Sequence, residues 1–459
     1  MSTRQPVVVL HVGAMKTGTT YLQNKVLANR DALAEQGVDF AGERWRQQVS
    51  AVQDLLSLAQ HDPNVEQLSS GAWDRLVHQI RGTDARASLL SMEFLSFAGE
   101  EAARRAVSSL QGLEVHVVIT VRDTAAIIPS LWQTSITSGG VTTWPRYTKV
   151  VRASMRAGGR VGSGLARAGV PSARRFGEAI DIPRMIRVWT SVLPADRVHV
   201  LVVPGSSAPR DRLWELFSEI LEVDPAALTA PPEHVNESLG LPSAELVRRL
   251  NAALRLRQPS QQRTVKVDLA RDGLGPLRAE ERRAQLDPAT FRAALRWNKH
   301  IRSVLASSGV RVHGDVADLP TEADPADYQV DAVQEPAAER ELIRAARQGF
   351  RTLRRLNRRL VREALPRQGR ARYLSHLAAQ LAFPRGWQAA DDPVALAVED
   401  LATLTRSAIR LERLAARRRR RARRRKARRR AARQAARRAE RRAERRGVSG
   451  AEAADASEG

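Results

Sequence analysis

The sequence predicts an α/β fold in which a parallel sheet carries helices on both faces and is followed by a helical extension. Short apolar, β-branched runs recur at 7–12, 88–91, 115–121 and 198–203, and such runs are typical of strands buried on both sides. The stretches between them place apolar residues at helical spacing. Strands that alternate with helices in this way form parallel sheets.

The first predicted strand leads into a loop rich in glycine and hydroxyl groups, His11–Thr20, with the sequence HVGAMKTGTT. A helix is predicted to follow over 21–30. The two glycines allow close approach of an anion, and the start of the helix adds oriented N–H groups. The candidate anion-binding residues are Gly13, Lys16, Thr17, Gly18, Thr19 and Thr20. The order strand, loop, helix predicts a phosphate-binding loop; the simpler alternative is an ordinary strand-to-helix turn.

The loop differs from the Walker A pattern GxxxxGK[ST] in the position of its lysine. Thr19 follows the second glycine, and Lys16 lies two residues before that glycine. Such a loop can hold a phosphate-like group, but it no longer matches the arrangement that encloses a triphosphate and its Mg²⁺. We therefore expect a smaller anion.

Two more polar residues are predicted at the same edge of the sheet. Arg122 follows the strand at 115–121, and Ser130 lies eight residues further on, in the next helix or turn. A guanidinium and a hydroxyl can clamp a dianionic phosphate, although an arginine after a strand is more commonly part of a surface ion pair. The carboxyl ends of parallel strands meet at one edge, so Arg122 is expected beside the loop.

Glu93 follows the predicted strand at 88–91 and is expected at this edge as well. Its carboxylate would then face the same crevice as the loop and the arginine. The alternative is a structural carboxylate at a helix N-terminus, where the helix dipole favours negative charge.

Together these residues resemble the sulfotransferase family that uses 3′-phosphoadenosine-5′-phosphosulfate, and its bacterial branch more closely. His11–Thr20 is similar to that family's 5′-phosphosulfate loop, and Arg122 with Ser130 is similar to its 3′-phosphate pair, spacing included. Glu93 is similar to the acidic residue that acts as base in the carbohydrate sulfotransferases. The resemblance ends near 319. No later segment matches the one that closes over the 3′-phosphate in better-known members.

The resemblance implies a P-loop-like sulfotransferase fold and a transfer that needs no metal. It implies that Lys16 and Glu93 are catalytic, and that 3′-phosphoadenosine-5′-phosphosulfate is the co-substrate. The donor-binding residues would be Gly13, Lys16, Thr17, Gly18, Thr19, Thr20, Arg122 and Ser130. The acceptor would be a hydroxyl or amine on a carbohydrate, a lipid or a secondary metabolite, and the sequence does not identify it.

Two other functions stay open at this point. One is a small-molecule kinase with a P-loop, against which the position of Lys16 argues. The other is a non-catalytic protein associated with nucleic acid through its basic tail.

Composition sets the outer limits. The 459 residues include no cysteine, which excludes disulfides and thiolate catalysis. The histidines show no paired spacing that predicts a metal site. No apolar stretch is long enough for a membrane span, and no signal peptide fits before the first strand, so a cytoplasmic location is expected.

The net charge of +25 is concentrated near the C-terminus. Residues 413–446 contain 19 arginines, one lysine and two glutamates, which leaves +7 for the remainder of the chain. This tail could contact a polyanion non-specifically, or an anionic membrane surface, although it lacks aromatic and apolar anchors. A solvated extension without a partner is the simpler alternative.

The domain organisation predicted from these patterns is an α/β domain at 1–320, a linker at 321–335, a helical extension at 336–392, a long Arg-rich helix at 393–446 and a disordered tail at 447–459. The extension contains an apolar stripe that begins at Leu342, and the last helix is expected to start near Pro393 after the cap candidates Asp391 and Asp392. A heptad-like seam runs from Val394 to Ala415. A loop is predicted over Arg152–Arg175.

Overall fold

The computed structural model describes residues 5–57, 69–156, 181–209, 211–231, 238–256, 259–322, 337–383 and 385–455. The chain forms two compact units. Unit 1 comprises Met1–Arg248 and Leu277–Ala338, and unit 2 comprises Arg249–Pro276 and Glu339–Gly459. The predicted linker at 321–335 lies almost wholly outside the described residues.

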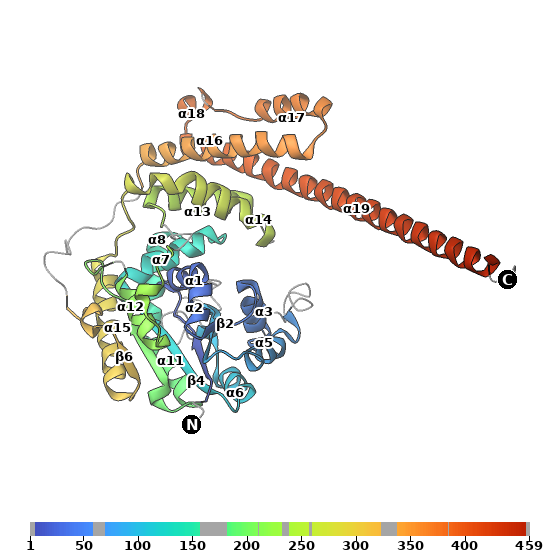
Figure 1. The fold of residues 1–459 in the computed structure, drawn as a ribbon. Helices are drawn as coiled ribbons and strands as arrows, with labels where there is room; N and C mark the ends of the chain where they lie inside the picture. Colours follow the sequence, from blue (N-terminus) through green and yellow to red (C-terminus); the bar gives the residue numbers. More distant parts are fainter. Residues whose placement is uncertain are drawn as a thin grey trace. The chain divides into compact units, whose positions relative to one another are not determined.

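Unit 1 is built on a parallel sheet, as the sequence predicts. Within the described residues its six strands run in the order β2-β3-β1-β4-β5-β6, and every neighbouring pair is parallel (Figure 1). The strands are β1 (Val7–His11), β2 (Val38–Phe40), β3 (Ala87–Ser91), β4 (Glu114–Val121), β5 (Val198–Val202) and β6 (Arg311–His313).

The four predicted strands are confirmed to within one residue at each end. The sequence did not indicate β2 and β6, the two edge strands of three residues each. Strand β6 shows why, because its first two residues are exposed and it therefore lacks the apolar run that marks a central strand.

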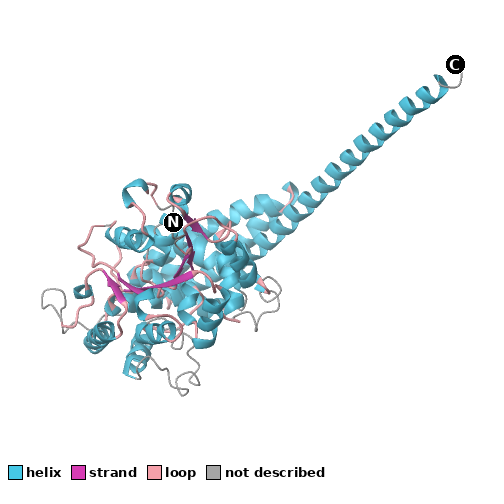
Figure 2. Cartoon of the chain, turned by 60° about the horizontal axis from the view of Figure 1, so that its bottom comes forward, coloured by secondary structure: helices cyan, strands magenta, loops and turns pink. Residues whose placement is uncertain are grey.

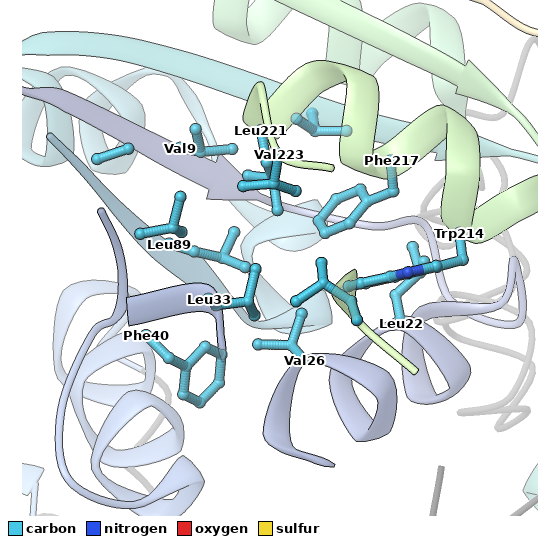
Figure 3. Packing of buried hydrophobic residues seen from close by; sticks show 14 of the residues in the cluster. Val9, Leu22, Val26, Leu33, Phe40, Leu89, Trp214, Phe217, Leu221 and Val223 are labelled. Atoms are coloured by element: carbon cyan, nitrogen blue, oxygen red, sulfur yellow. The ribbon is translucent and has the colours of Figure 1, made fainter. Parts of the chain in front are cut away.

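Helices cover both faces of the sheet. The helices α1 (Thr19–Ala28) and α12 (Arg212–Leu221) pack on one face, where Trp214 and Phe217 gather with Leu22 and Val26 over Val9 of β1 (Figure 3). The alternate residues of the central strands, such as Val8 and Ile119, are buried as well, so the other face is also covered. Helix α11 (Ile182–Thr190) packs against β4 and β5 and against α6 (Glu100–Ser109).

The other helices of unit 1 complete these two layers. The short η1 (Glu93–Phe97) follows β3, and α7 (Thr124–Thr137) follows β4. The other α-helices that the structure describes in this unit are α2 (Arg30–Glu35), α3 (Trp45–Leu55), α5 (Ala72–Arg81), α8 (Trp144–Arg156) and α15 (Pro288–Ser307), while α13 (Leu241–Leu254) begins in unit 1 and ends in unit 2.

The loop predicted over Arg152–Arg175 is wrong in its first part. Helix α8 continues to Arg156, and Arg152 within it forms a 2.7 Å salt bridge with Asp287. The remaining residues of the predicted loop lie outside the described part of the chain.

Unit 2 consists of helices joined by short loops, with no strand among its described residues (Figure 2). Its two long helices, α16 (Glu339–Ala364) and α19 (Pro393–Asp455), lie side by side over much of α16 (Figure 1). Its shorter segments are α14 (Pro259–Arg263), the π-helical η4 (Thr264–Leu274), α17 (Arg367–Ala379) and α18 (Arg385–Ala389). Segment η4 packs against α16 and α19 at Gly349, where a side chain would crowd Leu269 and Leu401.

The sequence patterns of this unit are confirmed in detail. The stripe that starts at Leu342 and the seam from Val394 to Ala415 are buried. The carboxylate of Asp392 accepts a 2.9 Å bond from the N–H of Ala395, as expected of a helix cap. The backbone of α19 stays helical to Asp455, past the predicted helix end at Arg446 and into the tail expected to be disordered.

Among the described residues, no helix combines the length and the apolar character that crossing a membrane requires.

Candidate functional site

The loop between β1 and α1 has a backbone that few residue types tolerate. Gly13, Lys16 and Gly18 all have positive φ angles, of 68°, 67° and 87°. Gly18 occupies the N-cap position of α1 in the left-handed conformation. A left-handed lysine is strained, by about 1–2 kcal/mol, and such strain is concentrated at functional loops.

Strand β4 holds this loop from one side. The N–H of Ala14 donates to the carbonyl and to the hydroxyl of Thr120, both at 3.1 Å. The hydroxyl of Thr17 donates to the carbonyl of Ala14 at 2.6 Å and lies 2.5 Å from the hydroxyl of Thr120. Thr17 is fully buried, so its hydroxyl fixes the loop. Any contact of Thr17 with an anion in the loop would use its backbone N–H.

Strand β3 holds the loop from the other side. The hydroxyl of Thr19 donates to Oε2 of Glu93 at 2.8 Å, which joins the first residue of α1 to the first residue of η1. A Cβ on Gly13 would lie 2.8 Å from Cγ2 of Thr19 and 3.4 Å from Cβ of Glu93. Gly13 is therefore required by this close packing as well as by its φ angle.

Helix α12 approaches the loop at its second glycine. A Cβ on Gly18 would lie 2.7 Å from a methyl group of Leu213. The loop is thus bounded by the start of η1, by β4 and by α12.

Arg122 lies at the carboxyl end of β4, two residues after Thr120. It forms no hydrogen bond or salt bridge with any residue that the structure describes. Burial lowers the pKa of its guanidinium, and the charge of the neighbouring Asp123 partly opposes that shift. A partly buried cation in this state lacks the partner that such groups normally have. Ser130 is half-buried in α7, and within the described part of the chain its hydroxyl forms no hydrogen bond with Arg122.

The turn that carries Arg122 is held by a residue that sequence reasoning missed. Asn298 of α15 is fully buried, accepts a 3.1 Å bond from the N–H of Thr124 and donates a 2.8 Å bond to Asp123. It also donates to the carbonyl of Pro320 at 2.9 Å. Asp123 precedes an apolar run, which is a local pattern typical of a helix cap, but no local pattern marks an asparagine 175 positions later.

His11 closes the floor of the site. Burial lowers its pKa to about 3, and Nδ1 lies 2.7 Å from the hydroxyl of Ser91. The ring therefore stays neutral at physiological pH and is not in contact with solvent. This environment makes His11 a structural residue and a poor candidate for a proton acceptor.

The structure brings most of the predicted site residues to one edge of the sheet, but some of their hydroxyl groups are engaged within the protein. The loop, Glu93 and Arg122 meet at one edge of the sheet, at the carboxyl ends of β1, β3 and β4. Thr17 and Thr19 have their hydroxyls engaged within the protein, while the hydroxyl of Thr20 makes no hydrogen bond with a described residue. The described residues contain no cluster of histidine and carboxylate side chains arranged to hold a metal ion.

Comparison of the chain with protein-family models, curated proteins and solved structures gives no match.

Proposed function

We propose that the chain is a sulfotransferase that moves a sulfuryl group from 3′-phosphoadenosine-5′-phosphosulfate to a hydroxyl or amine of an acceptor. The P-loop-like sulfotransferase fold is part of this proposal. The observation that carries it is Arg122, a partly buried guanidinium without a partner among the described residues, beside a loop of left-handed glycines. A cation held in this way is suited to an anionic ligand.

The loop supports the same assignment. It contains Lys16, Thr20 and the N–H groups at the start of α1, which suit a tetrahedral anion. Arg122 and Ser130, on the next strand and helix, would hold a second phosphate. Two separate anion positions fit a donor that carries a 3′-phosphate and a 5′-phosphosulfate.

The chemistry follows from the position of Glu93. Its carboxylate would accept the proton of the acceptor hydroxyl as the oxygen forms a bond to sulfur. The bond between sulfur and the 5′-phosphate oxygen breaks in the same step, and Lys16 with the loop N–H groups would stabilise the charge on the departing phosphate. Thr19 keeps Glu93 in place through its hydrogen bond. Positioning and electrostatics would supply the catalysis.

The test is calorimetric titration of the full chain with adenosine 3′,5′-bisphosphate, and separately with ATP and Mg²⁺. We expect metal-independent binding of the bisphosphate, weakened roughly 10- to 100-fold in Arg122→Ala because a charge-assisted bond is lost. Arg104→Ala is the matched control, since Arg104 is an exposed arginine on α6, away from the loop, that forms no ion pair with a residue the structure describes.

The outcomes separate the candidate functions. Preference for Mg-ATP would replace the sulfotransferase by a kinase. Equal loss of affinity in Arg104→Ala would show that binding is non-specific. Absence of binding for both nucleotides would leave the α/β unit without the proposed activity.

A further inference from the structure

The two units differ sharply in charge. Unit 1 contains 34 basic and 35 acidic residues, a net charge of −1, whereas unit 2 contains 41 basic and 15 acidic residues, a net charge of +26. The net positive charge of the chain therefore belongs to the helical unit. An excess of basic residues confined to one unit points to a polyanionic partner of that unit.

Part of this charge lines a groove. Helix α19 and the segment around α14 enclose a groove of about 390 Å³, with an apolar floor that includes Leu256, Ile409 and Leu414. Its basic lining residues are Arg406, Arg410, Arg413 and Arg417. They recur at intervals of four, three and four residues, so they follow one face of the helix for about 16 Å. None of the described lining residues is acidic.

The arginine face continues into a longer basic segment. Arg417–Arg421 are five consecutive exposed arginines, and the described residues from 417 to 425 are all exposed. Successive positions on a helix turn by about 100°, so the five arginines are distributed around α19. Two of them border α16: Arg418 donates to the carbonyl of Glu363 at 3.4 Å, and Arg419 forms a 3.2 Å salt bridge with the carboxylate of Glu363. Residues 413–446 carry a net +18 over a helix length of about 51 Å, roughly one charge per 2.8 Å.

This distribution decides between partners. A membrane-bound helix needs an apolar face opposite its basic face, but after Leu414 no apolar residue larger than alanine occurs before Val448. If a polyanion touched only one side of the helix, most of the arginines at 417–421 would contact no anionic group. The major groove of duplex DNA is about 12 Å wide, admits an α-helix and places phosphates along both walls. RNA duplexes have a major groove too narrow for this.

We propose that unit 2 binds duplex DNA through α19, with Arg417–Arg421 against the phosphates and the arginines of the groove extending the contact toward Arg406. The binding does not select a sequence, because a run of near-identical arginines presents the same charge at every position and can pair with phosphates in any register along the duplex. It requires no nucleotide in unit 1 and is independent of the sulfotransferase proposal.

The test is fluorescence anisotropy of a labelled duplex of about 24 base pairs titrated with the full chain over a salt series. Two variants replace all five residues Arg417–Arg421, one by glutamine and one by lysine. Both replacements keep good helix propensity, and only glutamine removes the charge. We expect at least tenfold weaker binding for the glutamine variant, and a salt slope reduced by about 4, at 0.9 per lost phosphate contact. The lysine variant should stay within about threefold of the wild type.

A third variant, Arg406→Gln with Arg410→Gln, tests the groove and should weaken binding roughly fivefold or more. Circular dichroism of each variant excludes loss of the helix. Unchanged DNA affinity in the five-glutamine variant would overturn the proposal. So would tighter binding of heparin than of duplex at equal charge concentration, or tighter binding to phosphatidylserine vesicles, since each would assign the helix to another partner.

Discussion

At the scale of single residues, the candidate site separates groups that hold the loop from groups that are left available. Thr17 and Thr19 resemble ligands in the sequence, yet their hydroxyls bond to Thr120 and Glu93 inside the protein. Arg122 has no such engagement. A ligand is therefore expected to meet Arg122 and Thr20, and to meet Thr17 only through backbone.

Arg122→Met tests this separation most directly. Methionine replaces the stem of the arginine and removes a partly buried charge that has no ion-pair partner. We expect the free energy of unfolding to stay equal or rise by up to about 1 kcal/mol, while bisphosphate affinity falls at least tenfold. Urea unfolding and calorimetry on the same preparation measure the two effects. A clear loss of stability would mean that Arg122 supports the fold.

Thr17→Val and Thr20→Val form a matched pair. The first removes a buried hydroxyl and leaves the carbonyl of Ala14 without that donor, so the free energy of unfolding should fall by about 1–3 kcal/mol. The second should change stability by less than about 0.5 kcal/mol but weaken bisphosphate binding severalfold. Reversed results would exchange the roles of the two threonines.

Glu93→Gln tests whether Glu93 accepts the proton of the acceptor hydroxyl. The amide oxygen of glutamine can still accept the hydrogen bond of Thr19, so the loop should keep its geometry. Once an acceptor is found, we expect turnover to fall roughly 10²- to 10⁴-fold with bisphosphate affinity unchanged. Full activity in this variant would remove Glu93 as the base, and the buried His11 would not be its replacement.

At the scale of elements, β4, β5 and β6 are joined by a chain of histidines. The ring of His116 lies 3.0 Å from Glu114 and 2.8 Å from His199, and His199 lies 2.9 Å from His313. A carboxylate can only accept, so Nε2 of His116 donates to Glu114. Each following ring then donates through Nε2 to Nδ1 of the ring before it. This directed chain needs every linking ring to be neutral.

The hydrogen-bonded row of histidines predicts that the protein loses stability in mild acid. Burial, followed by the charges of His116, His313 and Arg311, lowers the pKa of His199 to about 4. Because the unfolded chain takes up this proton near the ordinary value of 6.5, stability is complete above that pH and declines as the pH falls toward 4. The expected slope is up to about 1.4 kcal/mol per pH unit for His199. Burial of His11, with a pKa of about 3, acts in the same direction.

Urea unfolding between pH 8 and about pH 5 checks this, before most carboxylates titrate. Seven of the eight tryptophans belong to unit 1, so their emission follows the unit that contains the chain. His199→Gln should reduce the change of the free energy of unfolding with pH. The part of that change that comes from His11 should remain. An identical pH dependence of stability in wild type and variant would exclude the row of histidines as its cause.

Elements with a strong local pattern could be predicted from the sequence. The central strands and the seam of α19 are continuous apolar patterns, and both are confirmed. The pairing of η4 with α16 and α19 could not be predicted, because it joins residues near 270 with residues near 350 and 400. The bonds from Thr120 and Asn298 to the site are likewise long-range, and nothing in their local sequence marks them. The roles of Lys16, Glu93 and Arg122 stay predictions.

At the scale of the whole molecule, the charge of +25 is a property of one unit only. The proposed nucleotide site lies in a unit of net charge −1 and depends on a few partly buried groups. The proposed DNA surface depends on many exposed arginines. Salt screens exposed charges far more than buried ones, so the two activities should respond differently to ionic strength.

Raising the salt from about 0.05 M to about 0.2 M should weaken duplex binding 10³-fold or more if six or more phosphates are contacted. Over the same range, bisphosphate affinity should fall less than about tenfold, because Arg122 is partly buried. Anisotropy and calorimetry on one preparation supply both series. A parallel fall would mean that the bisphosphate binds the arginine helix, and the five-glutamine variant would then lose both activities. Independent responses would place two anion-binding functions on separate units of one chain.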